Sequence, residues 1–206
     1  MEDNKSQRVA KIKEELLNLK SSPLFEYRLR NNYSPVLGEG VLEAEVMLVG
    51  EAPGKEEAEQ GRPFVGSAGK ILDEVLNKIG LEREKIYITN LVNDRPPGNR
   101  APNKEEIELY SSFLMRQIQT IKPKIIVTLG RVSTDFILKE YNLSQETGSM
   151  AKLHGKIFTI NNLLGKIFII PMYHPAAVLY QPSIKHILED DMQTLKEKLG
   201  SIKRSN

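Results

Sequence analysis

The chain has 206 residues, a hydrophobic content of 40% and a net charge of +2, which are values of an ordinary globular protein. No run approaches the roughly 20 apolar residues that are needed to cross a bilayer, and the charged N-terminal stretch lacks the apolar central region of a signal peptide. We therefore expect a cytoplasmic protein that does not associate with a membrane. The absence of cysteine excludes disulfides, thiolate metal sites and iron–sulfur clusters, and the net charge alone does not indicate nucleic-acid binding.

The first predicted helix covers residues 6–20, where apolar residues recur at helical spacing: Val9, Ile12, Leu16 and Leu19. An irregular polar stretch follows. Together they form an N-terminal helix and loop, residues 1–43, ahead of a core that carries the motifs, residues 44–200. No repeat or linker divides the chain, so we expect one domain over residues 1–206.

Short β-branched runs predict the strands of a buried sheet. The four runs are residues 45–49, 85–89, 124–130 and 166–170. Residues 156–160 predict an antiparallel partner for the last of these strands. Because helical patterns alternate with the strands, we expect an α/β fold, a three-layer α/β/α sandwich around a central, mainly parallel four-stranded sheet.

The predicted helices carry recognisable end signals. Ser67 can cap a helix that stops at Gly80, and Asn103 with Glu106 can cap a longer one. A further helix passes through residues 136–137, and the last one covers residues 184–200.

Polar loops follow three of the strands. They begin at GEAPG, at Asn90 and at YHPAA, and the first loop continues into GRPFVG. Loops at the carboxyl ends of parallel strands converge on one crevice, where ligands bind. We therefore expect Glu51, Phe64, Asn90 and His174 to line one pocket.

The first loop offers backbone and carboxylate chemistry. Gly50 lets the chain come close to a ligand, and peptide groups of the turn, including that of Ala52, can hold a carbonyl or an anion. Glu51 can orient a water molecule or stabilise a developing cation. The alternative for Glu51 is a turn residue that faces solvent.

The other three loop residues suit a planar ring. Phe64 can stack on a base, and the amide of Asn90 can match the hydrogen-bonding edge of a nucleobase. His174 can donate a hydrogen bond to an oxygen that gains negative charge. Taken singly, each has a structural alternative: a loop anchor, a turn former and a packed histidine.

Two loops bear on DNA binding. Arg95 and Arg100, in RPPGNR, suit contacts to phosphates, and Val178 and Leu179 can wedge into a base stack. The alternatives are a solvated turn for the arginines and simple packing under the loop for the two apolar residues.

The assembled motifs resemble those of the family 4 uracil-DNA glycosylases, in the uracil-DNA glycosylase superfamily. The matching strings are GEAPG, QGRPFVGSAGKILD, GL-x-R-x-x-x-YITN, RPPGNR-x-P, QI-x-x-x-KPKIIVTLGR and YHPA, in the expected order across residues 38–191. The resemblance implies that Glu51 positions water and that His174 stabilises the departing uracil anion. It also implies that Phe64 stacks on the flipped base and that Asn90 reads its edge. Val178 and Leu179 fall in the loop that fills the vacated stack.

The chain departs from that family in its cysteines. Members carry four that hold an iron–sulfur cluster, and the positions that align with them are Leu19, Ser22, Asp94 and Tyr110. We therefore expect no cofactor and no metal, and we expect Tyr110 to join the Asp94 loop to the segment at Ser22. Two further departures are Ala58, at a position that is often acidic, and Tyr180, where an arginine often ends the wedge loop.

The expected activity is hydrolysis of the N-glycosidic bond of uracil in DNA after base flipping, which leaves an abasic site. No lysine stands among the matched pocket residues, so we expect a monofunctional enzyme without a lyase step. The expected partner is DNA that contains uracil, bound by a monomer. Two alternatives remain open: a homologue that binds uracil or DNA without catalysis, and a glycosylase for another deaminated base such as hypoxanthine or xanthine.

Overall fold

The computed structural model describes residues 4–146, 148–162 and 165–204. Across these ranges one sheet has the strand order β1-β3-β2-β4-β6-β5. The four inner strands are parallel: β3 (Tyr87–Asn90), β2 (Val46–Gly50), β4 (Ile125–Leu129) and β6 (Gly165–Met172). The antiparallel edges are β1 (Gly38–Gly40) and β5 (Phe158–Asn162). The predicted α/β fold with four parallel strands is confirmed, and the edge strands enlarge the sheet to six within the described ranges.

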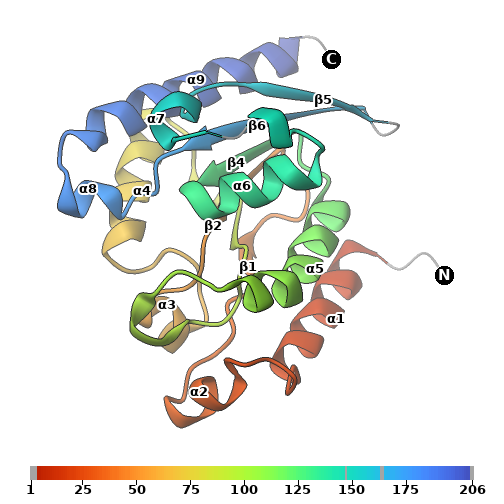
Figure 1. The fold of residues 1–206 in the computed structure, drawn as a ribbon. Helices are drawn as coiled ribbons and strands as arrows, with labels where there is room; N and C mark the ends of the chain where they lie inside the picture. Colours follow the sequence, from red (N-terminus) through yellow and green to blue (C-terminus); the bar gives the residue numbers. More distant parts are fainter. Residues whose placement is uncertain (1–3, 147, 163–164, 205–206) are drawn as a thin grey trace.

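Helices cover both faces of the sheet, as Figure 1 shows. Their bounds are α1 Lys5–Leu17, α2 Phe25–Arg30, α3 Lys55–Gln60, α4 Ser67–Lys78, α5 Lys104–Ile121, α6 Arg131–Glu140, α7 Met150–Leu153, α8 Ala177–Tyr180 and α9 Ile184–Arg204. Short 3₁₀ turns lie at Arg83–Lys85, Pro97–Asn99 and Ser144–Glu146. In the part of the chain that the structure describes, no helix is both long and apolar enough to cross a bilayer.

The sheet separates two apolar cores. Alternate residues of a strand point to opposite faces, so Val46 and Leu48 of β2 pack with α4 and α9, while Met47 and Val49 pack with α1, α5 and α6. Every residue of β2, β3 and β4 is buried, which explains why these strands read as continuous apolar runs. The arrangement is the expected three-layer sandwich.

Three predicted helix ends are wrong in detail. Helix α1 ends at Leu17 rather than at residue 20. The N-cap of α4 is Gly66 rather than Ser67, and this glycine has no side chain that could cap the helix itself. Helix α9 continues past Gly200, because Leu199 and Ile202 pack against the core and outweigh the ~1 kcal/mol that one glycine costs a helix. The predicted capping box of Asn103 and Glu106 is confirmed at the start of α5.

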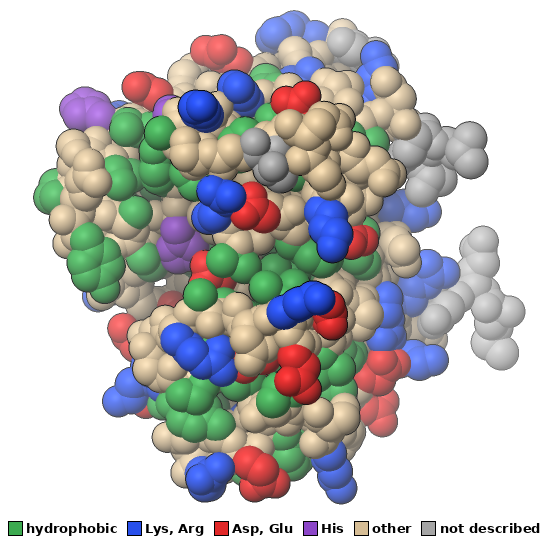
Figure 2. Space-filling view, in the orientation of Figure 1, with side chains coloured by type: hydrophobic (Ala, Val, Ile, Leu, Met, Phe, Trp, Pro, Cys, Tyr) green, Lys and Arg blue, Asp and Glu red, His purple; other side chains and the backbone are tan. Residues whose placement is uncertain are grey.

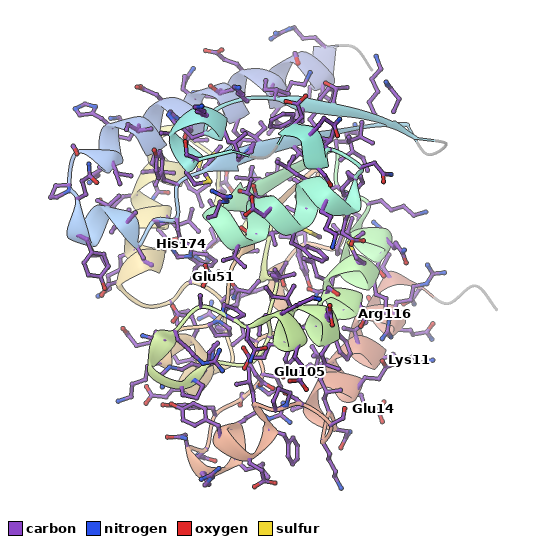
Figure 3. The ribbon with its side chains drawn as sticks, in the orientation of Figure 1. Lys11, Glu14, Glu51, Glu105, Arg116 and His174 are labelled. Carbon is purple, nitrogen blue, oxygen red and sulfur yellow. The ribbon has the colours of Figure 1, made fainter. Side chains whose placement is uncertain are left out.

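The N-terminal segment, residues 4–43, packs onto the core. Strand β1 pairs with β3, and the ammonium group of Lys5 donates to the carbonyl oxygens of Leu42 and Ile121. Figure 3 shows Arg116 of α5 on the side of the molecule where α1 carries Lys11 and Glu14, and Arg116 forms an ion pair with Glu15 of α1. Backbone pairing, hydrogen bonds and an ion pair therefore join this segment to the sheet and to α5.

A buried polar cluster joins this segment to α5 and the loop after β3. The Tyr110 hydroxyl donates to Asp94 at 2.5 Å and lies 2.7 Å from the hydroxyl of Ser22. The Arg28 guanidinium donates to the same carboxylate at 3.1 Å and to the carbonyl oxygen of Leu16 at 3.0 Å. Tyr110 thus connects the Asp94 loop to Ser22, as expected, and Arg28 supplies a counter-charge that the sequence did not indicate.

Candidate active site

The loops after β2, β3 and β6 meet at the carboxyl edge of the sheet and enclose a cavity of about 460 Å³. Figure 2 shows this face of the molecule hollowed between its upper and lower parts, and Figure 3 shows Glu51 and His174 close together between α6 and α3. The residues of the predicted site that line the cavity are Glu51, Ala52, Phe64, Asn90, Arg100, His174 and Leu179.

Gly50 lies just behind the cavity wall. A Cβ atom at this position would come within 2.3 Å of the Asn90 amide oxygen and 2.7 Å of the Phe64 ring. Any larger residue would therefore push these two side chains apart. Gly50 allows the ring and the amide to lie side by side against the backbone of β2.

Asn90 ends β3 and is 2% exposed. Its Oδ1 atom is buried and has no hydrogen-bond partner in the described protein. A buried acceptor without a partner costs roughly 1–3 kcal/mol, so native proteins rarely keep one without a reason. An amide that lines a cavity in this state suits a ligand that brings an N–H donor.

His174 follows β6 in a partly buried position. Its Nδ1 atom accepts a hydrogen bond from the backbone N–H of Ala176 at 3.1 Å. Burial lowers the pKa of His174 to about 4, so the ring is neutral near pH 7 and its proton is on Nε2. The ring also stacks on Phe64, with centroids 5.5 Å apart. The site therefore holds a neutral, oriented hydrogen-bond donor.

Glu51 follows β2 at the same edge and is half-buried. Burial raises the pKa of this carboxyl above the ordinary range of a glutamate. A carboxylate beside an aromatic ring and a neutral imidazole can orient a water molecule or face a developing positive charge.

The predicted DNA-contacting residues differ in where they lie. Arg95 does not line the cavity: its guanidinium donates to the Tyr33 hydroxyl at 2.6 Å and to Asn99 at 2.7 Å. Arg100 lines the cavity but forms a two-point ion pair with Glu106.

The two residues that were predicted to insert into a base stack, Val178 and Leu179, also differ in where they lie. Val178 is 9% exposed and packs in the core, because α8 turns this side chain toward α9. Leu179 is 52% exposed and Tyr180 is 89% exposed, and both line the rim of the cavity. The exposed apolar pair at the rim is therefore residues 179–180, one position later than the sequence predicts.

Two residues of this region were not predicted. Glu57 lines the cavity and accepts hydrogen bonds from the backbone N–H groups of Val65 and Gly66. Arg83 contacts the loop that carries Phe64 from its other side. The only signals in the sequence were the two adjacent glutamates after GEAPG and the arginine in GL-x-R, neither of which specifies a partner.

The positions that align with the four cysteines do not fit an iron–sulfur cluster. Ser22, Asp94 and Tyr110 are hydrogen-bonded to one another, and Leu19 packs as an apolar side chain. Thiolates hold such clusters, and this chain has no cysteine. The same region is held together here by hydrogen bonds and the ion pair between Arg28 and Asp94.

Comparisons with known proteins agree with this geometry. The family model described as "Uracil DNA glycosylase superfamily" matches residues 37–198. The chain is 49% identical to the type-4 uracil-DNA glycosylase of Saccharolobus solfataricus over 85% of its own length and 80% of the relative's. It is 46% identical to that of Sulfurisphaera tokodaii, over 91% and 83% of the two chains, and 42% identical to that of Archaeoglobus fulgidus, over 84% and 85%.

Proposed function

This chain belongs to the uracil-DNA glycosylase superfamily, and from that membership and the geometry of the cavity we propose that it removes uracil from DNA by hydrolysing the N-glycosidic bond. The observation that carries the proposal is the buried, unpartnered oxygen of Asn90 in one cavity with Phe64, His174 and Glu51. The target base leaves the duplex to enter this cavity, at a cost of roughly a few kcal/mol that is smallest for a mispaired base.

Recognition of the base rests on Asn90 and Phe64. Uracil presents an N–H donor beside a carbonyl oxygen, and the Asn90 amide offers an acceptor and a donor in the same plane. The Oδ1 atom that lacks a partner accepts the N–H of uracil, and the amide N–H donates to the adjacent oxygen. Cytosine presents no N–H at that ring position, so it leaves Oδ1 unpaired. Phe64 provides the ring on which the base stacks.

Bond cleavage rests on His174 and Glu51. As the bond breaks, the sugar gains positive charge and uracil leaves as an anion. The Nε2–H of neutral His174 donates to the uracil oxygen that gains the charge, and a neutral donor leaves the proton where it began. The Glu51 carboxylate faces the cationic sugar and holds the water molecule whose oxygen adds to it. The proton that this water loses passes to the carboxylate and then to solvent, and the uracil anion takes up a proton from solvent after it leaves. No step requires a lysine or a bound metal, which supports a monofunctional hydrolase.

DNA binding outside the cavity rests on its rim. Leu179 and Tyr180 are the exposed apolar residues there, so we assign to them the contact with the base stack that was predicted for Val178 and Leu179. Arg100 remains a phosphate contact, whereas Arg95 acts by holding its loop against Tyr33. Because one chain lines the whole cavity, we propose that a monomer is sufficient. The proposed substrate is cellular DNA, and we propose separately that the protein acts on it in the cytoplasm.

A cleavage assay tests the proposal. An oligonucleotide with one uracil, treated with the protein and then with alkali, should be cut at that position, in single turnover and without added metal. No cut at micromolar protein would refute the activity. A panel with hypoxanthine and xanthine separates the alternatives: cleavage of those bases but not uracil indicates another specificity, and uracil-dependent binding without any cut indicates a non-catalytic homologue.

A further inference from the structure

We propose that Glu57 and Arg83 are positioning residues that hold the loop of Phe64 from opposite sides and so fix the ring on which the base stacks. The inference rests on the proposed function, because it concerns the same cavity. It assigns a role in the reaction to two charged residues that stack on no base and break no bond.

The backbone at Phe64 needs external support. Its φ angle is +51°, in the left-handed region that a bulky residue rarely adopts. The next helix also comes unusually close, since a Cβ atom at Gly69 would lie 2.0 Å from the Phe64 carbonyl oxygen. The conformation therefore persists because neighbouring groups determine it, and the ring direction depends on them.

Glu57 holds the residues that follow the ring. Its Oε1 atom accepts the backbone N–H of Val65 at 2.9 Å and that of Gly66 at 2.8 Å. Both groups lie just before α4, where backbone N–H groups have no partner within the helix. A carboxylate is the favoured acceptor at such a helix start. Glu57 is 9% exposed, so water competes little for these bonds.

Arg83 holds the residues at and before the ring. Its guanidinium donates to the carbonyl oxygen of Phe64 at 3.1 Å and to that of Pro63 at 2.5 Å. A third bond to Asp73 of α4, at 2.9 Å, anchors the guanidinium itself. The planar group with several fixed donors makes these bonds together, which a lysine cannot do.

The two contacts together act on one side chain. Peptide groups on both sides of Phe64 are bonded to charged side chains from different elements, α3 and the 3₁₀ turn Arg83–Lys85. A shift of about 1 Å in a group that orients the substrate can slow a reaction roughly 100-fold. Loss of either contact should therefore reduce the rate through Phe64 alone.

A double-mutant cycle tests this dependence. Arg83→Met and Glu57→Ala are each made in the wild-type chain and in Phe64→Ala, and single-turnover cleavage of a uracil oligonucleotide is measured. We expect each to slow the wild-type chain about tenfold, and the Phe64→Ala chain less than about twofold. Equal slowing in both backgrounds would overturn the proposal, because it would show an effect that does not pass through the ring.

Matched variants separate the effect of positioning Phe64 from a nonspecific effect of mutation on the rate. Glu57→Gln keeps an oxygen for both backbone N–H groups and removes the charge near His174, so its rate should stay within about twofold of wild type. A tenfold loss in Glu57→Gln would show that the charge, not the loop contact, matters. Arg62 lies in the same loop as Phe64 and forms an exposed ion pair with Glu39 of β1, so Arg62→Met should leave the rate unchanged.

Two further measurements keep the test decisive. If Arg83→Met does not fold, as judged by thermal melting, Arg83→Lys replaces it in the cycle. If the wild-type chain makes no abasic product, the proposed function fails first. The same cycle is then measured as binding of an oligonucleotide that carries 2-aminopurine beside the uracil, and additive losses in binding would overturn the inference independently.

Discussion

In the proposed mechanism His174 is a neutral donor, and two features of its surroundings support this assignment. Burial lowers its pKa to about 4, and the N–H of Ala176 occupies Nδ1, so only the tautomer with a proton on Nε2 fits. A donor of this kind stabilises the departing base without needing to lose its proton. Its strength comes from the fixed geometry and the low dielectric around it.

Replacement of His174 by alanine should therefore slow single-turnover cleavage by about 100- to 1000-fold, the usual effect of one donor to a developing anion. Binding to uracil DNA should change by less than about threefold, since the bond is strongest in the transition state. His186→Ala is the control, because its imidazole is exposed on α9 away from the cavity. Equal losses in binding and rate would show that His174 binds the base without assisting the chemistry.

The titration of Glu51 predicts how the cleavage rate depends on pH. Burial raises its pKa, so the rate should fall as the pH falls through that raised value, where the carboxylate to which we assign the water molecule takes up a proton. His174 is neutral over this range and adds no second step until about pH 4. The Glu51→Gln variant should be slow at pH 7 and should lack this acid-side decline in single-turnover rate.

The same pKa shift predicts an opposite effect on stability. The folded chain binds the Glu51 proton more tightly than the unfolded chain, so ionisation lowers the free energy of unfolding as the pH rises through the window up to the raised pKa. Glu51→Gln should thus be more stable than wild type at pH 7, with a gain that shrinks in acid. Urea unfolding at both pH values measures this, and a gain that grows in acid would contradict the assignment.

At the scale of the elements, helix α5 makes contacts that join the cavity to the buried polar cluster and to β3. Its capping residue Glu106 is fully buried and also pairs with Arg100 at the cavity, while one turn later Tyr110 reaches the buried cluster. Farther along α5, the side-chain amide oxygen of Gln117 accepts a hydrogen bond from the hydroxyl group of Thr89, in β3, at 3.0 Å. The helix therefore fixes both the strand that ends in Asn90 and the loop that follows it.

Tyr110→Phe should destabilise the protein by about 1–3 kcal/mol, because Asp94 loses a donor while staying buried. Chemical denaturation measures the change. Tyr180→Phe is the control: its side chain is 89% exposed, and its free energy of unfolding should stay within about 0.5 kcal/mol of wild type. A neutral effect of Tyr110→Phe would show that the cluster does not support the fold.

The strongly periodic elements could be predicted from the sequence, and the polar ones could not. Helices α4 and α5 and the inner strands bury apolar residues at regular spacing, which is the signal that sequence patterns carry. Helix α3, KEEAEQ, has one apolar residue, and β1, GEG, has none, so each depends on tertiary contacts that no local pattern shows.

The site residues at strand ends could be predicted from the sequence, and those on helices or turns could not. Glu51, Asn90 and His174 stand at strand ends or within two residues of them, and the rule that strand ends converge brings them to one edge. Glu57, Arg83 and Arg28 lie on helices or turns, where charged residues usually face solvent. Their roles appear only when the partner groups, mostly backbone N–H and carbonyl groups, are placed in space.

At the scale of the whole molecule, the N-terminal segment completes the sheet edge and one apolar core. It supplies an edge strand, an amphipathic helix against α5 and the counter-charge of Asp94. Removal of one partner from a buried ion pair alone costs about 3–5 kcal/mol, a large share of the 5–15 kcal/mol that holds a typical domain. The core of residues 44–200 should therefore not be stable by itself.

A chain that lacks residues 1–43 should show no cooperative thermal unfolding by circular dichroism. The control is the full chain with Glu15→Gln, which breaks only the partly exposed ion pair between α1 and α5 and should melt within a few degrees of wild type. A sharp transition in the shortened chain would show that the sheet and its remaining helices suffice.

The cluster of Ser22, Arg28, Asp94 and Tyr110 has a consequence for how the protein matures. Hydrogen bonds and an ion pair form as soon as the chain folds, from atoms that translation already supplies. This junction needs no inorganic sulfide and no assembly machinery, and neither peroxide nor a chelator removes any part of it. The formation and the persistence of this junction are therefore independent of iron supply and of oxygen.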